Sequence, residues 1–146
     1  MPALGRLGWR ILGVPLTAAD RATLLQSMIG GRSRSDALDF MRTGASHNTE
    51  KSGALLGAQA IFVVVDIFAL DHGWPNRTII ASMLTLLAGA MIVMANLKGA
   101  TGMYTGDPVT GVFHMVLRRS LRFNLALYLT YASILLLGFA ALSVLR

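Results

Sequence analysis

The chain has 146 residues, of which 54% are hydrophobic and 14% charged, and its mean hydropathy of +0.59 is unusual for a soluble domain. It contains no cysteine, which excludes disulfides, thiolate metal sites, iron–sulfur clusters and cysteine nucleophiles. This length leaves room for one domain with a short appendage, and not for a membrane domain together with an enzyme domain. The net charge of +6 is compatible with either nucleic acid or anionic lipid as a partner.

Residues 1–51 are expected to form an N-terminal segment in the cytoplasm and at the membrane surface. Its first part, Met1–Leu16, carries Arg6 and Arg10 within an apolar stretch and lacks a signal-peptide cleavage pattern. Such a stretch is typical of a short helix in the membrane interface, with Trp9 as an interfacial anchor at headgroup depth. A mitochondrial presequence, which is also basic and poor in acids, is the alternative.

Short helices and a turn are predicted for the rest of this segment. Thr17 and Asp20 favour a helix start with Thr17 as the cap, and Gly30-Gly31 predicts its end. Ser35–Thr43 is a further, weaker helix candidate. The polar stretch Gly44–Thr49 is predicted as a turn before the first membrane span.

Three apolar runs dominate the remainder of the chain: residues 53–70, 78–97 and 121–145. Asp66 is the only acid in them, and Arg122 stands at the mouth of the third. At about 1.5 Å per residue, each helical run can cross or nearly cross a hydrocarbon layer of about 30 Å. Because irregular backbone is costly in lipid, the sequence predicts an all-α integral membrane protein whose residues 52–146 form a domain of three transmembrane helices.

The first two spans are predicted to form an antiparallel hairpin. They are joined by Asp71–Arg77, in which Trp74 is a candidate anchor in the aromatic belt and Pro75 keeps the two helices from fusing. The next loop is rich in glycine and contains Asp107-Pro108, which is predicted as a turn. From about Val112 to the end of the third span, a single helix is expected.

Basic residues are distributed unevenly around the spans. All Lys and Arg residues except Arg77 and Arg146 lie before the first span or at the connection between the second and third spans. The positive-inside rule therefore predicts a cytoplasmic N-terminus and an exoplasmic C-terminus. We expect the bacterial inner membrane, with the mitochondrial inner membrane as an alternative.

The basic residues also predict a partner. No basic segment has the interleaved aromatics of a nucleic-acid site, so anionic membrane lipid is expected and nucleic acid is not. Arg118, Arg119 and Arg122 lie where the last helix enters the membrane and form a candidate headgroup-binding site. The alternative is that they only set the topology.

Two polar side chains lie within the first span. Asp66 is about 7–8 Å below its outer end, and Gln59 lies seven residues earlier on the same helix face. The two predict a polar stripe that faces a neighbouring helix. A structural pairing and a role in proton or ion handling are both open readings of this stripe.

Small residues predict where helices pack closely. Gly53 and Gly57 open the first span, and Ala81, Thr85 and Gly89 repeat every four residues along the second. Packing inside the bundle is the preferred interpretation for the second span. The pattern alone does not distinguish packing within one chain from packing between subunits.

The sequence contains no recognisable catalytic or metal-binding motif. Metalloprotease, nucleophile-elbow and phosphate-loop patterns are all missing, so no catalytic residue and no enzyme activity are predicted. His47, His72 and His114 fall outside the apolar runs, which argues against haem or pigment ligation. We therefore expect neither a metal nor a cofactor.

The stretch from Thr49 to Ala60, read as TEKSGALLGAQA, resembles the opening of the first helix in Pycsar-type transmembrane effectors of antiphage defence. In that family a helical hairpin follows, then a cytosolic segment and a last helix flanked by basic residues. The present chain differs in its longer N-terminal segment and shorter inner loop. The resemblance implies membrane disruption triggered by a signal.

Three functions are compatible with these observations. The preferred one is a non-catalytic accessory subunit of a larger inner-membrane complex of respiratory or photosynthetic type, because the N-terminal segment is too small to form a core alone. The alternatives are the membrane-disrupting effector and a small oligomeric transporter or channel. The partner is accordingly a larger membrane-protein complex or a homo-oligomer.

Overall fold

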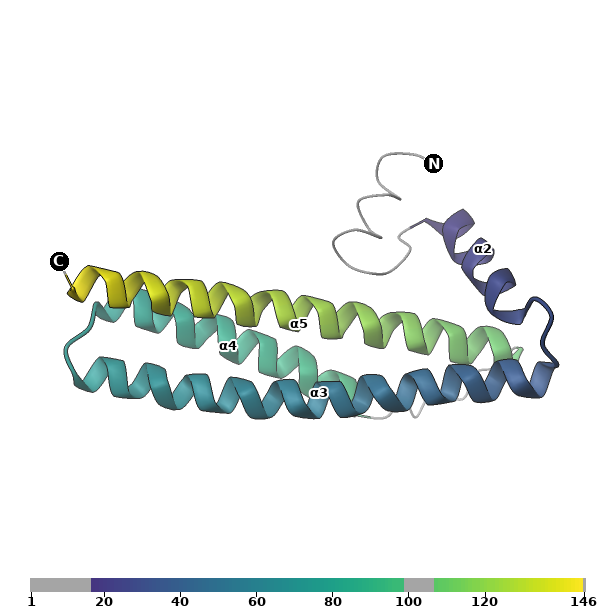
Figure 1. Cartoon of the computed structure of the whole chain (residues 1–146), viewed down its shortest axis with the longest axis horizontal. Coiled ribbons are helices and arrows are strands. Elements are labelled where there is room, and N and C mark those ends of the chain that lie inside the picture. The colour runs from purple at the N-terminus through teal and green to yellow at the C-terminus, as the bar shows by residue number, and fades with distance from the viewer. Residues whose placement is uncertain (1–16, 99–106, 146) are drawn as a thin grey trace. The chain divides into compact units, whose positions relative to one another are not determined.

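The computed structural model describes residues 17–98 and 107–145, and within these ranges it is all-α. Its helices are α2 (Ala18–Ile29), α3 (Arg34–Asp71), α4 (Asn76–Leu97) and α5 (Pro108–Val144) (Figure 1). The last three are long and apolar enough to cross a membrane, which confirms the predicted three-span fold. The predicted interfacial helix with Trp9 lies outside the described residues, as does most of the glycine-rich loop between α4 and α5.

The chain divides into two compact units. The boundary between them crosses α3 after Glu50 and α5 after Asn124. Unit 1 contains α2 and the N-terminal parts of α3 and α5. Unit 2 contains α4 and the C-terminal parts of α3 and α5, and therefore the polar residues predicted inside the membrane.

In unit 1, α2 begins and ends as the sequence predicts. The Thr17 side chain accepts a hydrogen bond from the backbone N–H of Asp20 at 3.2 Å, and the helix ends at Gly30, followed by Gly31 with φ of 78°. Apolar residues of α2 pack against a buried cluster formed by α3 and α5. The buried members are Met41, Val109 and Phe113, and the α2 residues against them are Leu24, Leu25 and Met28.

The prediction of a turn at Gly44–Thr49 is wrong, because α3 is one continuous helix of 38 residues. Met41 and Ala45 are buried, and the Asn48 amide donates to the Ser120 hydroxyl on α5 at 3.0 Å. These contacts with the neighbouring helix hold a polar, turn-rich stretch in helical conformation, because tertiary packing outweighs local propensity.

The predicted turn at Asp107-Pro108 is instead the start of α5. Pro108 is the first helical residue, and the Asp107 carboxylate accepts hydrogen bonds from the Thr110 hydroxyl at 3.1 Å and the Thr110 N–H at 3.3 Å. Arg34 forms an ion pair with the same carboxylate. Desolvation alone raises the pKa of Asp107, but the Thr110 hydrogen bonds and the Arg34 charge outweigh it, so that the pKa is lowered.

In unit 2, α4 runs back along α3 after a short turn, as predicted (Figure 1). Gly73 adopts a positive φ of 74°, a conformation that glycine takes without steric strain. The N–H of Trp74 donates to the carbonyl of Ala69 at 3.0 Å, and the Trp74 side chain packs beside Ile79. This turn fixes how α4 is aligned with α3.

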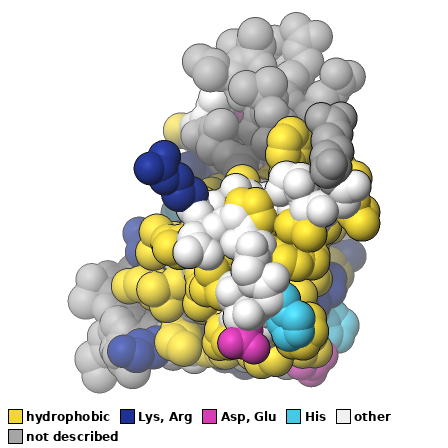
Figure 2. Space-filling view, turned by 90° about the vertical axis from the view of Figure 1, so that its left-hand side faces the viewer, with side chains coloured by type: hydrophobic (Ala, Val, Ile, Leu, Met, Phe, Trp, Pro, Cys, Tyr) yellow, Lys and Arg dark blue, Asp and Glu magenta, His cyan; other side chains and the backbone are white. Residues whose placement is uncertain are grey.

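Large hydrophobic side chains cover the outside of unit 2. On α5, Leu135 and Phe139 are 72% and 76% exposed, and Val64 on α3 is 65% exposed. Figure 2, which looks onto the end that carries the α3–α4 turn, shows hydrophobic side chains along the flanks of the described surface. Such a surface suits a lipid or protein environment and not water.

Candidate functional site

The buried face of α4 follows a seven-residue repeat. Its buried residues alternate three and four positions apart: Ile79, Ser82, Leu86, Gly89, Val93 and Asn96. On α3 the buried residues Ser52, Leu55, Gln59, Asp66 and Ala69 follow the same seven-residue repeat, although no residue between Gln59 and Asp66 is fully buried. A 3.5-residue repeat is the pattern of helices that pack at a shallow left-handed angle.

One position in each heptad of this repeat carries a polar residue or glycine. Ser52, Gln59 and Asp66 on α3 lie opposite Asn96, Gly89 and Ser82 on α4. Each step of seven residues up α3 therefore matches a step of seven residues down α4. The result is three polar layers about 10 Å apart along the bundle.

The polar layer nearest the α3–α4 turn surrounds Asp66, which is fully buried. The Ser82 hydroxyl oxygen lies 2.8 and 3.1 Å from the two carboxylate oxygens of Asp66 and 2.7 Å from the Ser133 hydroxyl oxygen. One hydroxyl chain thus links α3, α4 and α5. An ionised Asp66 accepts from Ser82, and a protonated one can donate to it, so the layer is hydrogen-bonded in either state.

The middle layer is built around Gln59, which is 1% exposed. Its amide nitrogen donates to the Thr130 hydroxyl at 2.9 Å, and Thr130 in turn donates to the carbonyl of Ala126. Gly89 faces the same amide. A Cβ at Gly89 would lie 2.6 Å from the Gln59 nitrogen, so glycine is what makes room for this hydrogen bond.

The third layer joins the middle of α3 to the C-terminal end of α4. The Asn96 amide donates to the Ser52 hydroxyl at 3.3 Å, and both residues are buried. Apolar residues separate the three layers, including Leu55 and Val93 on one side of Gln59 and Leu86 on the other. The hydrogen bonds of Asp66, Gln59 and Ser52 described above therefore each lie within a single layer.

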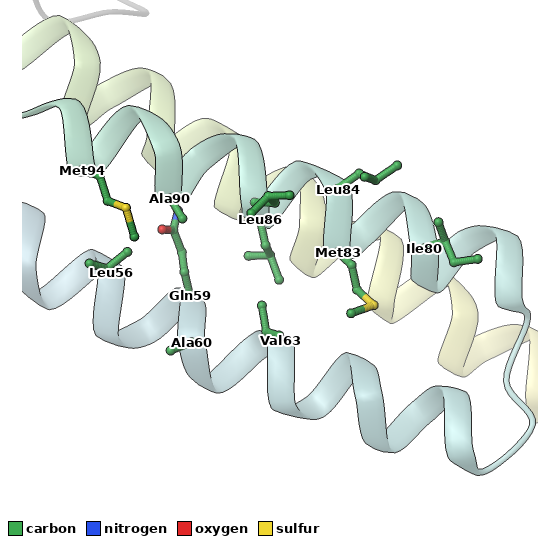
Figure 3. A pocket seen from close by; sticks show the side chains of 11 residues that line it. Leu56, Gln59, Ala60, Val63, Ile80, Met83, Leu84, Leu86, Ala90 and Met94 are labelled. Atoms are coloured by element: carbon green, nitrogen blue, oxygen red, sulfur yellow. The ribbon is translucent and has the colours of Figure 1, made fainter.

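A groove of about 630 Å³ lies between α3 and α4 (Figure 3). Its walls are apolar side chains, except for Gln59 at its base. Figure 3 shows Gln59 reaching from α3 toward Ala90 on α4. No described residue donates a hydrogen bond to the Gln59 amide oxygen, which is buried in this groove.

The predicted small residues fall on different faces. Gly89 is buried in the middle layer, while Ala81 and Thr85 are half-buried. The Thr85 hydroxyl donates to the carbonyl of Ala81 at 3.0 Å, within its own helix. Gly53 and Gly57 are exposed, and a Cβ at either position would meet nothing within 4 Å. Their use in packing against another chain stays a prediction.

The three arginines of α5 do not share one environment. Arg119 is half-buried and donates to the Thr49 hydroxyl on α3 at 3.2 Å. Arg118 and Arg122 are exposed and lie one helical turn apart. The three arginines therefore differ in exposure, and Arg119 is the one bonded to Thr49 on α3.

The sequence predicted Gln59 and Asp66 but not the residues bonded to them, Thr130 for Gln59 and Ser82 for Asp66, nor Ser133, to which Ser82 is also bonded. The missing signal was the seven-residue repeat of polar or small residues on the second span, in register with that on the first. Comparison of the chain with protein-family models, with curated proteins and with solved structures finds no match.

Replacing Gly89 with alanine tests the middle layer. The new methyl group displaces the Gln59 amide and breaks its bond to Thr130, so Gly89→Ala should lower the free energy of unfolding by about 0.6–1.7 kcal/mol. Thermal unfolding in mild detergent measures this change. The matched control, Gly57→Ala, adds the same methyl group at an open position. Equal effects of the two substitutions would contradict the packing of this layer.

Replacing Ser82 tests the polar layer around Asp66. Ser82→Ala leaves the Asp66 carboxyl without its described side-chain partner, which should reduce the free energy of unfolding by about 1–3 kcal/mol. Ser143, whose hydroxyl donates to the carbonyl of Ala140 within α5, provides the control substitution Ser143→Ala. A loss in Ser82→Ala no greater than in this control would show that the layer contributes nothing to stability.

Proposed function

We propose that the chain is a non-catalytic structural subunit of a larger assembly in the bacterial inner membrane. The observation that carries this proposal is the outward face of α3, where Gly53, Gly57 and Ala60 are exposed beside the α3–α4 groove. Small residues on a lipid-facing helix let another helix backbone approach closely. The face therefore suits a further membrane-spanning helix.

The polar layers support a structural role for the intramembrane residues. Polar groups that pair across helices fix the register and order of a bundle. Asp66 is bonded to the Ser82 hydroxyl on α4, which in turn is bonded to the Ser133 hydroxyl on α5, and buried apolar residues lie between this layer and the next. This arrangement favours a subunit with a rigid bundle over a transporter.

The membrane-disrupting effector is the second candidate. The stretch that resembles Pycsar-type effectors, residues 49–60, contains all three residues of the exposed small-residue face. Self-association through this face would serve an effector as well as a subunit. The two functions differ in whether the partners are other proteins or only copies of this chain.

The assembly role predicts co-migration with a larger complex. Extracted in mild detergent, the protein should run on native gels well above its monomer mass, with co-migrating proteins identified by mass spectrometry. Gly53→Leu with Gly57→Leu should release it from the complex because the bulky side chains block close approach. Ala54→Leu, which adds the same bulk at another exposed position of α3, is the control. A protein found only as a monomer or homo-oligomer would favour the effector.

The proposed orientation rests on the distribution of Lys and Arg. A reporter fused after the C-terminal Arg146 should be active only outside the cytoplasm, and one inserted in the loop between α4 and α5 only inside it. The reverse pattern would overturn both the topology and the placement of α2 in the cytoplasm.

Arg118 and Arg122 are proposed to bind an anionic lipid headgroup. Both are exposed at the start of the span, and a guanidinium can hold a phosphate through two hydrogen bonds, whereas an ammonium acts as a point charge. Arg118→Lys with Arg122→Lys keeps the charge and should lower the phosphatidylglycerol retained on purification, measured by mass spectrometry. Arg119→Lys, at the position that bonds Thr49, is the control. If the double variant retains as much phosphatidylglycerol as the parent, Arg118 and Arg122 do not form a specific lipid site and serve only to orient the chain in the membrane.

A further inference from the structure

Of the two polar atoms of the Gln59 amide, the nitrogen is hydrogen-bonded and the oxygen is not, among the described residues. Its nitrogen donates to Thr130 inside the bundle, whereas its oxygen lies in the α3–α4 groove with no donor among the described residues. A buried carbonyl without a hydrogen bond is unfavourable in a membrane interior. The groove is therefore shaped for an apolar occupant that carries one hydrogen-bond donor.

The side chains that line the groove are smallest beside this oxygen. Ala60 on α3 and Ala90 on α4 line it at the level of Gln59, with larger side chains such as Val63 and Met94 farther along (Figure 3). Small side chains on both walls make this the point where a flat ring would displace the least of the wall to reach the buried oxygen, so we expect the donor on an aromatic group.

Tyr131 on α5 supplies such a donor on the outside of the same bundle. It is 52% exposed, and no described residue accepts a hydrogen bond from its hydroxyl. It lies 13 residues before Val144, about 20 Å from the outer end of α5, which is deeper than the interfacial belt where tyrosines usually reside. A phenol without a partner at this depth is as unfavourable as the Gln59 oxygen.

The donor and the acceptor lie at the same height in the membrane. The 2.9 Å bond from Gln59 to Thr130 places these two residues level, and Tyr131 follows Thr130 by one residue, about 1.5 Å along the helix. Copies of one chain that cross the same membrane stand at equal depth. Two copies side by side, without vertical displacement, therefore present Tyr131 of one at the level of Gln59 of the other.

We propose that the occupant of the α3–α4 groove is α5 of a second copy, whose Tyr131 hydroxyl donates to the Gln59 amide oxygen. The outward face of α5 carries Leu135 and Phe139 beyond Tyr131, and these provide apolar surface to cover the groove. The donor and acceptor lie on different surfaces of one chain, so the contact is head-to-tail. Such contacts extend into rings or open arrays and do not stop at a dimer.

This inference rests on the proposed assembly role and adds that copies of this chain contact one another within the assembly, beside its contacts with other proteins. Because the chain has no cysteine, introduced cysteines report this contact directly. In membranes, Ala60→Cys combined with Tyr131→Cys in one chain should give a ladder of oxidised dimers, trimers and larger species. The control pairs Ala54→Cys, on another part of the exposed surface of α3, with Tyr131→Cys and should give no ladder. No crosslink, or crosslinking that stops at dimers, would overturn the head-to-tail contact.

The hydroxyl itself is tested by removing one oxygen atom. Tyr131→Phe should weaken self-association in liposomes about 3- to 20-fold, measured by energy transfer between labelled copies, as expected for the loss of one interhelical hydrogen bond. Tyr128→Phe, one turn earlier on α5, should leave it unchanged. Equal association of Tyr131→Phe and the parent would overturn the role of the hydroxyl. The proposed function can fail separately, because a ladder can form even where no other protein co-migrates.

Discussion

The organisation of the membrane-spanning unit depends on the cost of leaving a polar group unpaired in hydrocarbon. The Asp66 carboxyl is paired with the Ser82 hydroxyl, which is itself bonded to Ser133, and the Gln59 amide is paired with Thr130 through its nitrogen but not through its oxygen. Each pairing joins different helices, so satisfying the polar groups also determines which residues of the three helices face each other. The apolar residues between the layers then fill the remaining space.

The fold was largely predictable because its signals are local. Apolar runs give the spans, and Thr17 with Gly30 marks the ends of α2. The turn expected at residues 44–49 failed because the composition of a short stretch does not reveal the contact of Asn48 with Ser120, 72 residues away. Local sequence patterns could not predict the contacts between residues that are far apart in the chain.

The candidate site was predictable only in part for the same reason. A carboxylate or an amide in a span is rare and draws attention by itself, whereas serine is common in membrane helices. Ser82 becomes significant only when α3 and α4 are aligned and its hydroxyl is opposite Asp66. The unpaired Gln59 oxygen could not be predicted from the sequence at all, because the lack of a donor among the described residues becomes known only when the neighbouring side chains have been placed.

The seven-residue repeat has a further consequence for folding. Sliding α4 along α3 by one heptad would bring Asn96 opposite Gln59 and Gly89 opposite Asp66, so the periodicity that aligns the helices also creates competing alignments. The short connection at Gly73 excludes these, since it leaves no spare chain to span the extra 10 Å or so of displacement. Loop length, and not side-chain chemistry alone, therefore selects the native alignment from a set of related ones.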